Sequence, residues 1–90
     1  GAILSIGTIE FMKKATFKDN FALNGGNGGG FCNGGQVTFN LRAIFRNNTV
    51  ESSYSDDGEP YNGHGPGLFN KGGSSTVLFK RLALFKDNIG

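Results

Sequence analysis

The sequence predicts an all-β protein: a right-handed parallel β-helix, or solenoid, with three coils of three short strands and no significant helix. Three observations favour this fold. The chain contains an internal repeat. Within each repeat, apolar residues alternate with polar ones, which is the period of a β-strand. Glycine supplies 16 of the 90 residues without the every-third-residue spacing of collagen, so tight turns must separate many short strands.

The repeat is defined by the pattern Ile/Val-x-Phe-x-x-x-Ala-x-Phe-x-x-Asn, which begins at Ile9, Val37 and Val77. A glycine-led apolar step precedes each copy, so each unit has three apolar segments. Such a unit suits one coil of a parallel β-helix, in which equivalent strands stack about 4.8 Å apart. The parallel connections predict a right-handed path. The expected strands are 2–4, 8–12 and 15–19 in the first coil, 30–32, 36–40 and 43–47 in the second, and 67–69, 76–80 and 83–87 in the third.

We expect a single domain made of these three coils. Their bounds are 1–28 for coil 1, 29–50 for coil 2, with an insertion loop at 51–65, and 66–90 for coil 3. Because no covering element is evident at either end, we expect a fragment of a longer β-helix or a subunit continued by another chain. The expected partners are therefore the remainder of a longer β-helix or other protein chains stacked on the ends.

Stacking should place equivalent side chains in columns through the interior. Two phenylalanine columns are expected, with small alanines between them that let the rings interdigitate. The columns are Phe11, Phe39 and Phe79, and Phe17, Phe45 and Phe85. Cys32 follows Phe31 in a buried segment, and we interpret it as a small hydrophobic residue rather than a nucleophile.

Asparagine recurs at the corner after the third strand of each coil, at Asn20, Asn48 and Asn88. An asparagine permits a left-handed turn, and its side chain can bond to its copy in the next coil. We therefore predict a structural ladder rather than a ligand site. The neighbouring Asn47 begins an Asn-Asn-Thr triplet and is a possible N-glycan acceptor.

The cations fall into two sets of columns, although the net charge is only +2. The columns are Lys13, Lys14, Arg42, Lys80 and Arg81 in the turn between the second and third strands, and Lys18, Arg46 and Lys86 beside the inward phenylalanines. Stacked like charges favour an acidic polysaccharide, an anionic surface or an acidic protein as partner. The alternative is a solvated basic edge. Nucleic acid is not expected, because the strands lack outward aromatic residues for base stacking.

The insertion loop is a possible binding loop, since insertions in repeat proteins project from one face. Its candidate residues are Tyr54, Asp56, Asp57, Glu59, Tyr61 and His64. The alternative is a solvated connection. Its Asp-Asp-Gly and Gly-His-Gly steps resemble those of polygalacturonases, but here they share one loop instead of standing on successive coils. The acidic spacing does not match a calcium loop, and we expect no metal and no cofactor.

Two short motifs occur together in this chain: a Gly-Gly-apolar step, and Phe-x-x-Asn at residues 17–20, 45–48 and 85–88. Their combination resembles the repeats of polymorphic outer-membrane-protein type. The resemblance implies a right-handed parallel β-helix from a secreted or surface-displayed protein, in the manner of adhesins and autotransporter passengers. It also implies an extracellular or cell-surface location. The sequence departs from the family pattern at 29–32 and 65–68.

The function expected from the sequence is that of a non-catalytic structural or interaction module, used for adhesion, assembly or display. One alternative is a carbohydrate-active β-helix that binds or cleaves polysaccharide, and another is a small accessory subunit of a larger complex. We do not expect an enzyme, because the candidate residues form no convincing catalytic constellation. No apolar run approaches the ~18 residues of a membrane-spanning segment.

Overall fold

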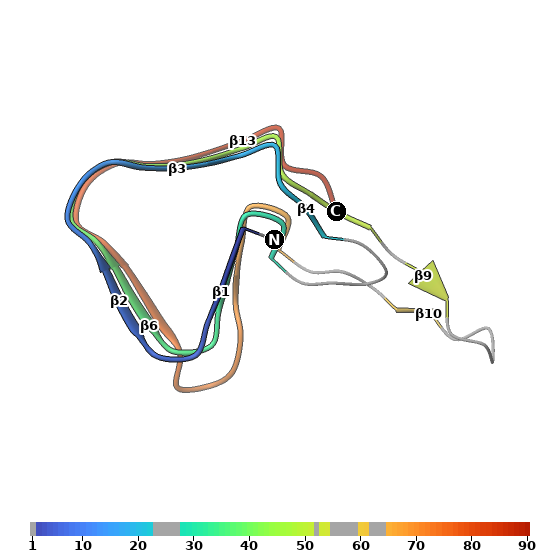
Figure 1. Ribbon diagram of the computed structural model, residues 1–90, viewed down its shortest axis with the longest axis horizontal. Coiled ribbons are helices and arrows are strands. Elements are labelled where there is room, and N and C mark those ends of the chain that lie inside the picture. Colours follow the sequence, from blue (N-terminus) through green and yellow to red (C-terminus); the bar gives the residue numbers. More distant parts are fainter. Residues whose placement is uncertain (1, 23–27, 52, 55–59, 62–64) are drawn as a thin grey trace.

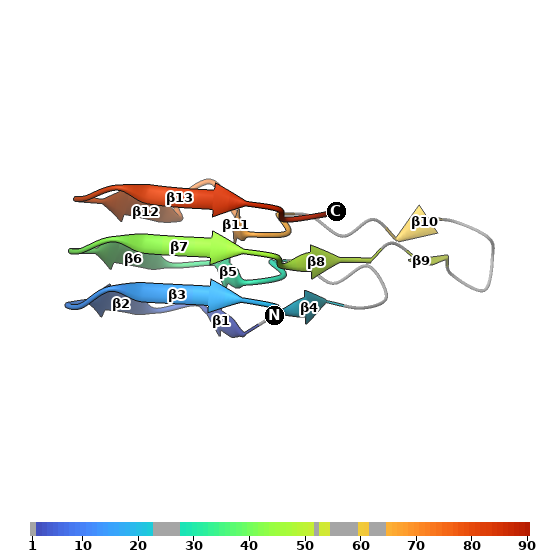
Figure 2. The same ribbon diagram turned by 90° about the horizontal axis from the view of Figure 1, so that it is seen from above.

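The computed structural model describes residues 2–22, 28–51, 53–54, 60–61 and 65–90. In this part of the chain the secondary structure is entirely β, without a helix, and hence without one long and apolar enough to cross a membrane. Figure 2 shows the main strands in three layers. The strands are β1 (Ile3–Ser5), β2 (Thr8–Phe11), β3 (Ala15–Lys18), β4 (Phe21–Ala22), β5 (Phe31–Asn33), β6 (Gln36–Phe39), β7 (Ala43–Arg46), β8 (Thr49–Val50), β9 (Ser53–Tyr54), β10 (Pro60–Tyr61), β11 (Leu68–Asn70), β12 (Thr76–Phe79) and β13 (Ala83–Lys86).

Three parallel sheets form the body, and each takes one strand from every copy of the repeat. Their orders are β1-β5-β11, β12-β6-β2 and β13-β7-β3, so the second copy is always central. Equivalent positions are paired: Ile9 and Val77 both lie opposite Val37. The sequence repeat therefore sets the register. Figure 1 looks along the stack, where the three copies overlie one another around a shared interior.

A fourth strand segment corrects the expectation of three strands per copy. β4 pairs in parallel with β8, so that Phe21 lies opposite Thr49 and Ala22 opposite Val50. Thr49 also forms an isolated parallel bridge with Ile89. These residues directly follow the repeated asparagines, so pairing between copies continues beyond that corner. The segments are too short to show the alternation by which the other strands were found.

Strands β9 and β10 belong to the insertion and lie outside the three-layered body. They pair with each other in antiparallel fashion, with Pro60 opposite Tyr54 and Tyr61 opposite Ser53. Figure 2 shows them to one side of the stacked strands. The insertion therefore adds a small separate ladder without adding a layer to the stack.

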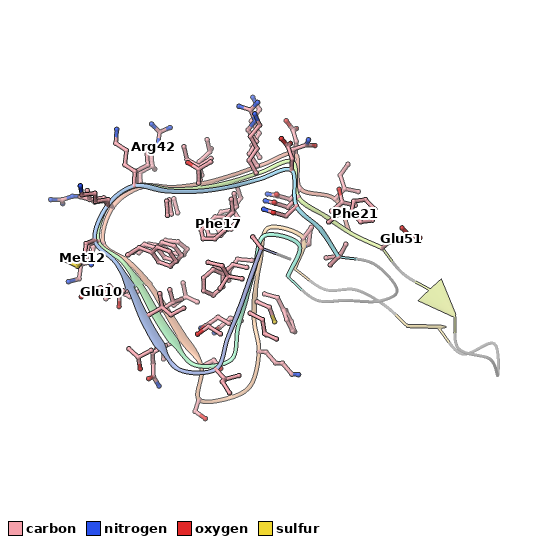
Figure 3. The ribbon with its side chains drawn as sticks, in the orientation of Figure 1. Glu10, Met12, Phe17, Phe21, Arg42 and Glu51 are labelled. Carbon is pink, nitrogen blue, oxygen red and sulfur yellow. The ribbon has the colours of Figure 1, made fainter. Side chains whose placement is uncertain are left out.

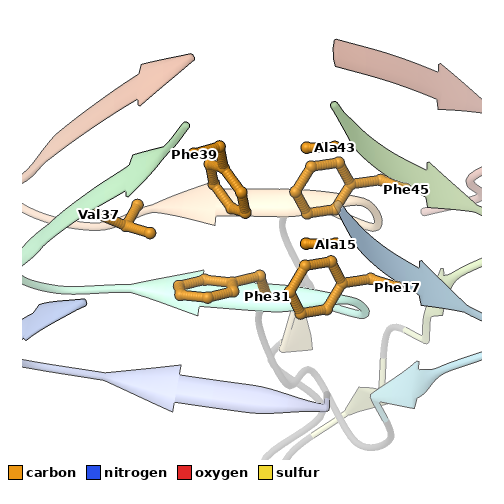
Figure 4. Close-up of a cluster of buried hydrophobic side chains, with 7 residues drawn as sticks. All are labelled: Ala15, Phe17, Phe31, Val37, Phe39, Ala43 and Phe45. Carbon is orange, nitrogen blue, oxygen red and sulfur yellow. The ribbon is translucent and has the colours of Figure 1, made fainter. Parts of the chain in front are cut away.

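The core lies between the sheets and is most completely closed in the second copy. Phe39 and Phe45 are at most 1 % exposed, whereas Phe11 and Phe79, which have a described neighbour on one side, are only partly buried. Inward side chains are spaced by two, as the strand period requires. The buried cluster in Figure 4 consists of Ala15, Phe17, Phe31, Val37, Phe39, Ala43 and Phe45.

Close approach between copies explains one of the glycines. A Cβ added at Gly35 would overlap the carbonyl oxygen of Gly7 in the preceding copy. Gly7 itself holds the equivalent position in the first copy, and a Cβ added there meets nothing within 4 Å. The requirement for glycine at this turn therefore comes from the neighbouring copy and not from the turn alone.

Candidate functional site

The repeated asparagines Asn20, Asn48 and Asn88 form a hydrogen-bonded row across the three copies. The backbone N–H and Nδ2 of Asn20 both donate to Oδ1 of Asn48, at 3.1 and 2.9 Å. The same two groups of Asn48 donate to Oδ1 of Asn88, each at 3.0 Å. Nδ2 of the fully buried Asn48 also donates to the Phe17 carbonyl at 2.9 Å. The side chains thus satisfy polar groups that the corner would otherwise bury without partners.

The row has a direction. In both steps, the copy nearer the N-terminus donates and the next copy accepts. At one end, Nδ2 of Asn88 donates to the Phe45 carbonyl at 2.9 Å, and no described group accepts from its second amide hydrogen or from its backbone N–H. At the other end, no described group donates to Oδ1 of Asn20. The two ends of the row are therefore complementary.

The left-handed backbone lies one residue before each row asparagine, which corrects the expectation that the same residue makes the turn. The φ angles are 59° at Asp19, 55° at Asn47 and 55° at Asp87. Aspartate and asparagine tolerate this region better than most residues. Asn47 is exposed, and its Nδ2 donates to Oδ1 of Asp19 at 2.6 Å. The amide that a glycan would occupy is therefore hydrogen-bonded here.

A second polar row, which the repeat pattern did not reveal, lies at the corner after the first strand of each copy. Ser5 and Asn70 both pair with Asn33, which is fully buried. Nδ2 of Asn33 donates to Oδ1 of Asn70 at 2.8 Å and to the Gly35 and Thr76 carbonyls at 3.1 and 3.0 Å. The signal for this row was a Ser/Asn-x-Gly step in all three copies. It was obscured because the first copy uses serine and the third has a longer turn.

The phenylalanine rings stack in two columns across the copies. Neighbouring rings within a column are nearly parallel, with centroids 4.7–5.0 Å apart. Rings of the two columns meet edge to face, at 5.8–6.1 Å within a copy and at 6.3 Å between copies. Both arrangements are favoured by the ring quadrupoles. The columns are Phe11, Phe39 and Phe79, and Phe17, Phe45 and Phe85, and Figure 3 shows Phe17 pointing into the interior.

Cys32 lies between the inward residues Phe31 and Asn33 in β5, so alternation places it on the outward side of the strand. It is nevertheless buried. The backbone at Gly28 lies against it, since a Cβ added to Gly28 would be 2.7 Å from the Cys32 Cβ. The thiol is not in a disulfide. A thiol buried in this way packs as a small apolar group.

Lys18, Arg46 and Lys86 form a row of exposed cations on sheet β13-β7-β3, where they are directly paired in register. Lys18 Nζ lies 3.9 Å from Oδ2 of Asp19, and the two side chains are 51 % and 53 % exposed. An ion pair so open to solvent contributes little stability. This row is therefore continuous and only weakly neutralised.

The turn between the second and third strands holds five more cations, but it does not stack them in one column. Its rows are Met12, Asn40 and Lys80, then Lys13, Leu41 and Arg81, then Lys14, Arg42 and Leu82. Leu41 separates Lys13 from Arg81, so only Lys14 and Arg42 are direct neighbours of like charge in these rows. Figure 3 shows Arg42 pointing away from the interior.

Most of the candidate binding loop lies outside the described residues. This applies to Asp56, Asp57, Glu59 and His64. The backbones of Tyr54 and Tyr61 lie in the antiparallel strands β9 and β10. The loop residues therefore remain candidates on sequence grounds.

The described ranges contain no group of three or more His, Cys, Asp or Glu residues placed to hold a metal ion. Comparisons of the chain with protein-family models, curated proteins and solved structures found no match. Function must therefore be inferred from the repeat, its pairing and its surface.

Proposed function

We propose that the chain is part of a right-handed parallel β-helix and serves as a non-catalytic structural or interaction module, in adhesion, assembly or display outside the cell or at its surface. The register supports this most directly, because each residue of these strands pairs with the residue at the equivalent position of the next copy. The resemblance of the Gly-Gly-apolar and Phe-x-x-Asn motifs to polymorphic outer-membrane-protein repeats points to the same class.

The edges of the sheets support a role in assembly. Within the described residues, β1, β2 and β3 are paired on one side, as are β11, β12 and β13. Unpaired strand edges add further strands readily. The donors left at Asn88 match the acceptor left at Asn20, so both ends suit head-to-tail addition of another coil. That coil comes from the same protein or from a second chain.

Two end variants of the chain test this proposal. Ile3→Glu places a charge at the inner side of the first layer, and Phe85→Glu places one in the half-exposed core of the last layer. We expect the unchanged chain to associate with rising concentration in sedimentation velocity, and each variant to remain monomeric. Mixed in equal amounts, the two variants should form a 1:1 dimer, because each retains one intact end.

Leu82→Glu is the matched control, since Leu82 belongs to the same last layer but is exposed on its outward side, and the variant receives the same charge. It should associate like the unchanged chain. Circular dichroism confirms that each variant keeps its β structure. A chain that stays monomeric at every concentration, or two end variants that still associate separately, would contradict head-to-tail stacking.

The carbohydrate-cleaving alternative is tested separately. The chain is incubated with polygalacturonate and with alginate, and new reducing or unsaturated ends are measured. We expect none above a heat-denatured control. New ends released in proportion to the amount of native chain would replace the structural proposal with a catalytic one.

A further inference from the structure

One face of the molecule carries cations without interspersed acids. We define the basic face by two sets of positions. The first is the outward positions of sheet β13-β7-β3, and the second is the residue that directly precedes each of these three strands. These positions are Lys14, Thr16 and Lys18 in the first copy, Arg42, Ile44 and Arg46 in the second, and Leu82, Leu84 and Lys86 in the third. Alternation along a strand puts all of them on the side opposite the inward-facing alanines and phenylalanines.

Among the described residues, few acids lie near this face. The acids that the structure describes are Glu10, Asp19, Glu51 and Asp87. Glu10 lies on a different sheet, and Glu51 lies beyond β8. Asp19 and Asp87 occupy the corner beside Lys18 and Lys86, where the exposed pair at 3.9 Å is weak. The cations outside the face lie in the turn that leads into it, except Lys71, which lies in the turn after β11.

The spacing of these cations favours a linear ligand with regularly repeated negative charge. Along the stack, Lys18, Arg46 and Lys86 follow one another at the strand spacing of about 4.8 Å. Like charges this close repel one another unless an anion lies along them. A linear acidic polysaccharide carries a carboxylate or sulfate on successive sugars, and the length of a sugar ring is similar to the strand spacing. Arginine can bind each such group with two parallel hydrogen bonds.

The other polyanions fit this face less well. The outward positions hold no aromatic side chain, and stacking on aromatic rings is the means by which single-stranded nucleic acid is usually held. The outward apolar residues Ile44, Leu82 and Leu84 lie in the second and third copies, and the first copy has Thr16 between two lysines, so no apolar stripe runs the length of the face to enter a lipid surface. Thr16 and Ile44, which lie between the cation rows, have short side chains with methyl groups against which a sugar ring can pack.

We infer that the basic face binds a linear acidic polysaccharide that runs along the stack, with Arg42 and Arg46 of the central copy as its principal contacts. This inference goes beyond the proposed structural role. It depends on the register of β3, β7 and β13 and does not require the ends of the molecule to associate.

The test compares two variants with equal loss of positive charge. Arg42→Gln with Arg46→Gln removes two charges from the face, whereas Lys71→Gln with Gln36→Glu changes the net charge equally at exposed positions away from it. Binding of the full chain to fluorescent polygalacturonate and to heparin is measured at low salt and again at high salt. We expect about a tenfold loss of affinity for the face variant and less than twofold for the control, with binding by the unchanged chain weakened by salt.

Three outcomes would overturn the inference. The first is no binding of either polymer at low salt, and the second is an equal loss in both variants, which would mean nonselective attraction by net charge. The third is tighter binding to a single-stranded DNA oligomer or to phosphatidylserine vesicles than to either polysaccharide, which would assign the face to a different partner. Thermal melts of both variants establish that the fold is intact. Sedimentation velocity on the same samples measures head-to-tail association separately. A failure of polysaccharide binding can therefore be told apart from a failure of the stacking proposal.

Discussion

Phe45 and Phe85 occupy the same position in successive copies of the repeat, yet Phe45 is fully buried and Phe85 is 50 % exposed. Both are phenylalanines at the third position of equivalent strands, and they lie directly opposite each other. The difference is the number of described layers beside them, since β7 is central and β13 lies at the edge of the sheet. Burial at the third copy therefore depends on what lies on its outer side, whereas Phe17, in the strand at the opposite edge of the sheet, is only 6 % exposed.

The largest effect on stability should follow from removing the phenyl ring of the central copy. Phe45→Ala removes a ring that stacks on Phe17 and Phe85 at 5.0 and 4.7 Å and leaves a cavity between them. We expect a loss of about 4 kcal/mol in the free energy of unfolding. Phe85→Ala should lose roughly 1.5 kcal/mol, because its ring is already half exposed. Equal losses in urea unfolding would show that the two copies are equally enclosed.

A slightly smaller effect is expected at the central asparagine. Asn48→Asp keeps the acceptor for Asn20 but replaces the amide that donates to Phe17 and Asn88. A buried oxygen would then face two other oxygens, and we expect a loss of about 3 kcal/mol in the free energy of unfolding. The matched change Asn20→Asp, at the partly buried end of the row, should cost about half as much. Thermal denaturation of the two variants measures the difference, and a larger loss at Asn20 would contradict the central role of Asn48.

Two equivalent glycines provide the third comparison. Gly35→Ala forces a Cβ against the Gly7 carbonyl and should destabilise the fold by about 2 kcal/mol. Gly7→Ala should be nearly neutral, because no described atom lies within 4 Å of its added Cβ. Unfolding of both variants in urea gives the two values. A large loss for Gly7→Ala that grows with protein concentration would instead indicate a further layer packed against the first copy.

The smallest expected effect is a gain. Asp87 has a φ of 55°, and glycine adopts this region without steric penalty, so Asp87→Gly should stabilise the fold by about 0.5 kcal/mol. Asp19 has a similar φ, but its Oδ1 accepts from Asn47 and its Oδ2 lies near Lys18. Asp19→Gly should therefore bring no gain. The midpoints of thermal unfolding decide between the two, and a loss for Asp87→Gly would indicate that its carboxylate has a stabilising contact.

The sequence was most informative where a position recurs unchanged. Phe39 and Asn48 have the same residue type at the matching position of every copy, and because parallel pairing joins matching positions, their neighbours followed directly. The all-β fold class and the bounds of the nine expected strands, to within one residue, followed from the same alternation. These features are local or repeated, and both kinds can be read from one chain.

The features that were not predicted depend on backbone geometry at the corners. The Asn33 row was missed because its first member is Ser5 and because the turn after Asn70 is longer. The left-handed residue could not be told apart from the asparagine beside it by composition alone, since both residue types favour turns. The cations of the turn were expected to align because every copy has cations there, whereas the register places Leu41 between Lys13 and Arg81.

The one-way orientation of the asparagine row has an electrostatic consequence. Each amide turns its oxygen towards the first copy, where it accepts, and donates towards the third, so the dipoles of Asn20 and Asn48 are aligned along the stack. Aligned amides polarise one another, and a chain of such bonds is stronger than its isolated members. The row therefore gives the stack an axial polarity, much as the peptide dipoles do in a helix. A layer added upside down would place oxygen against oxygen at Asn20, or N–H against N–H at Asn88, so this polarity disfavours a reversed layer.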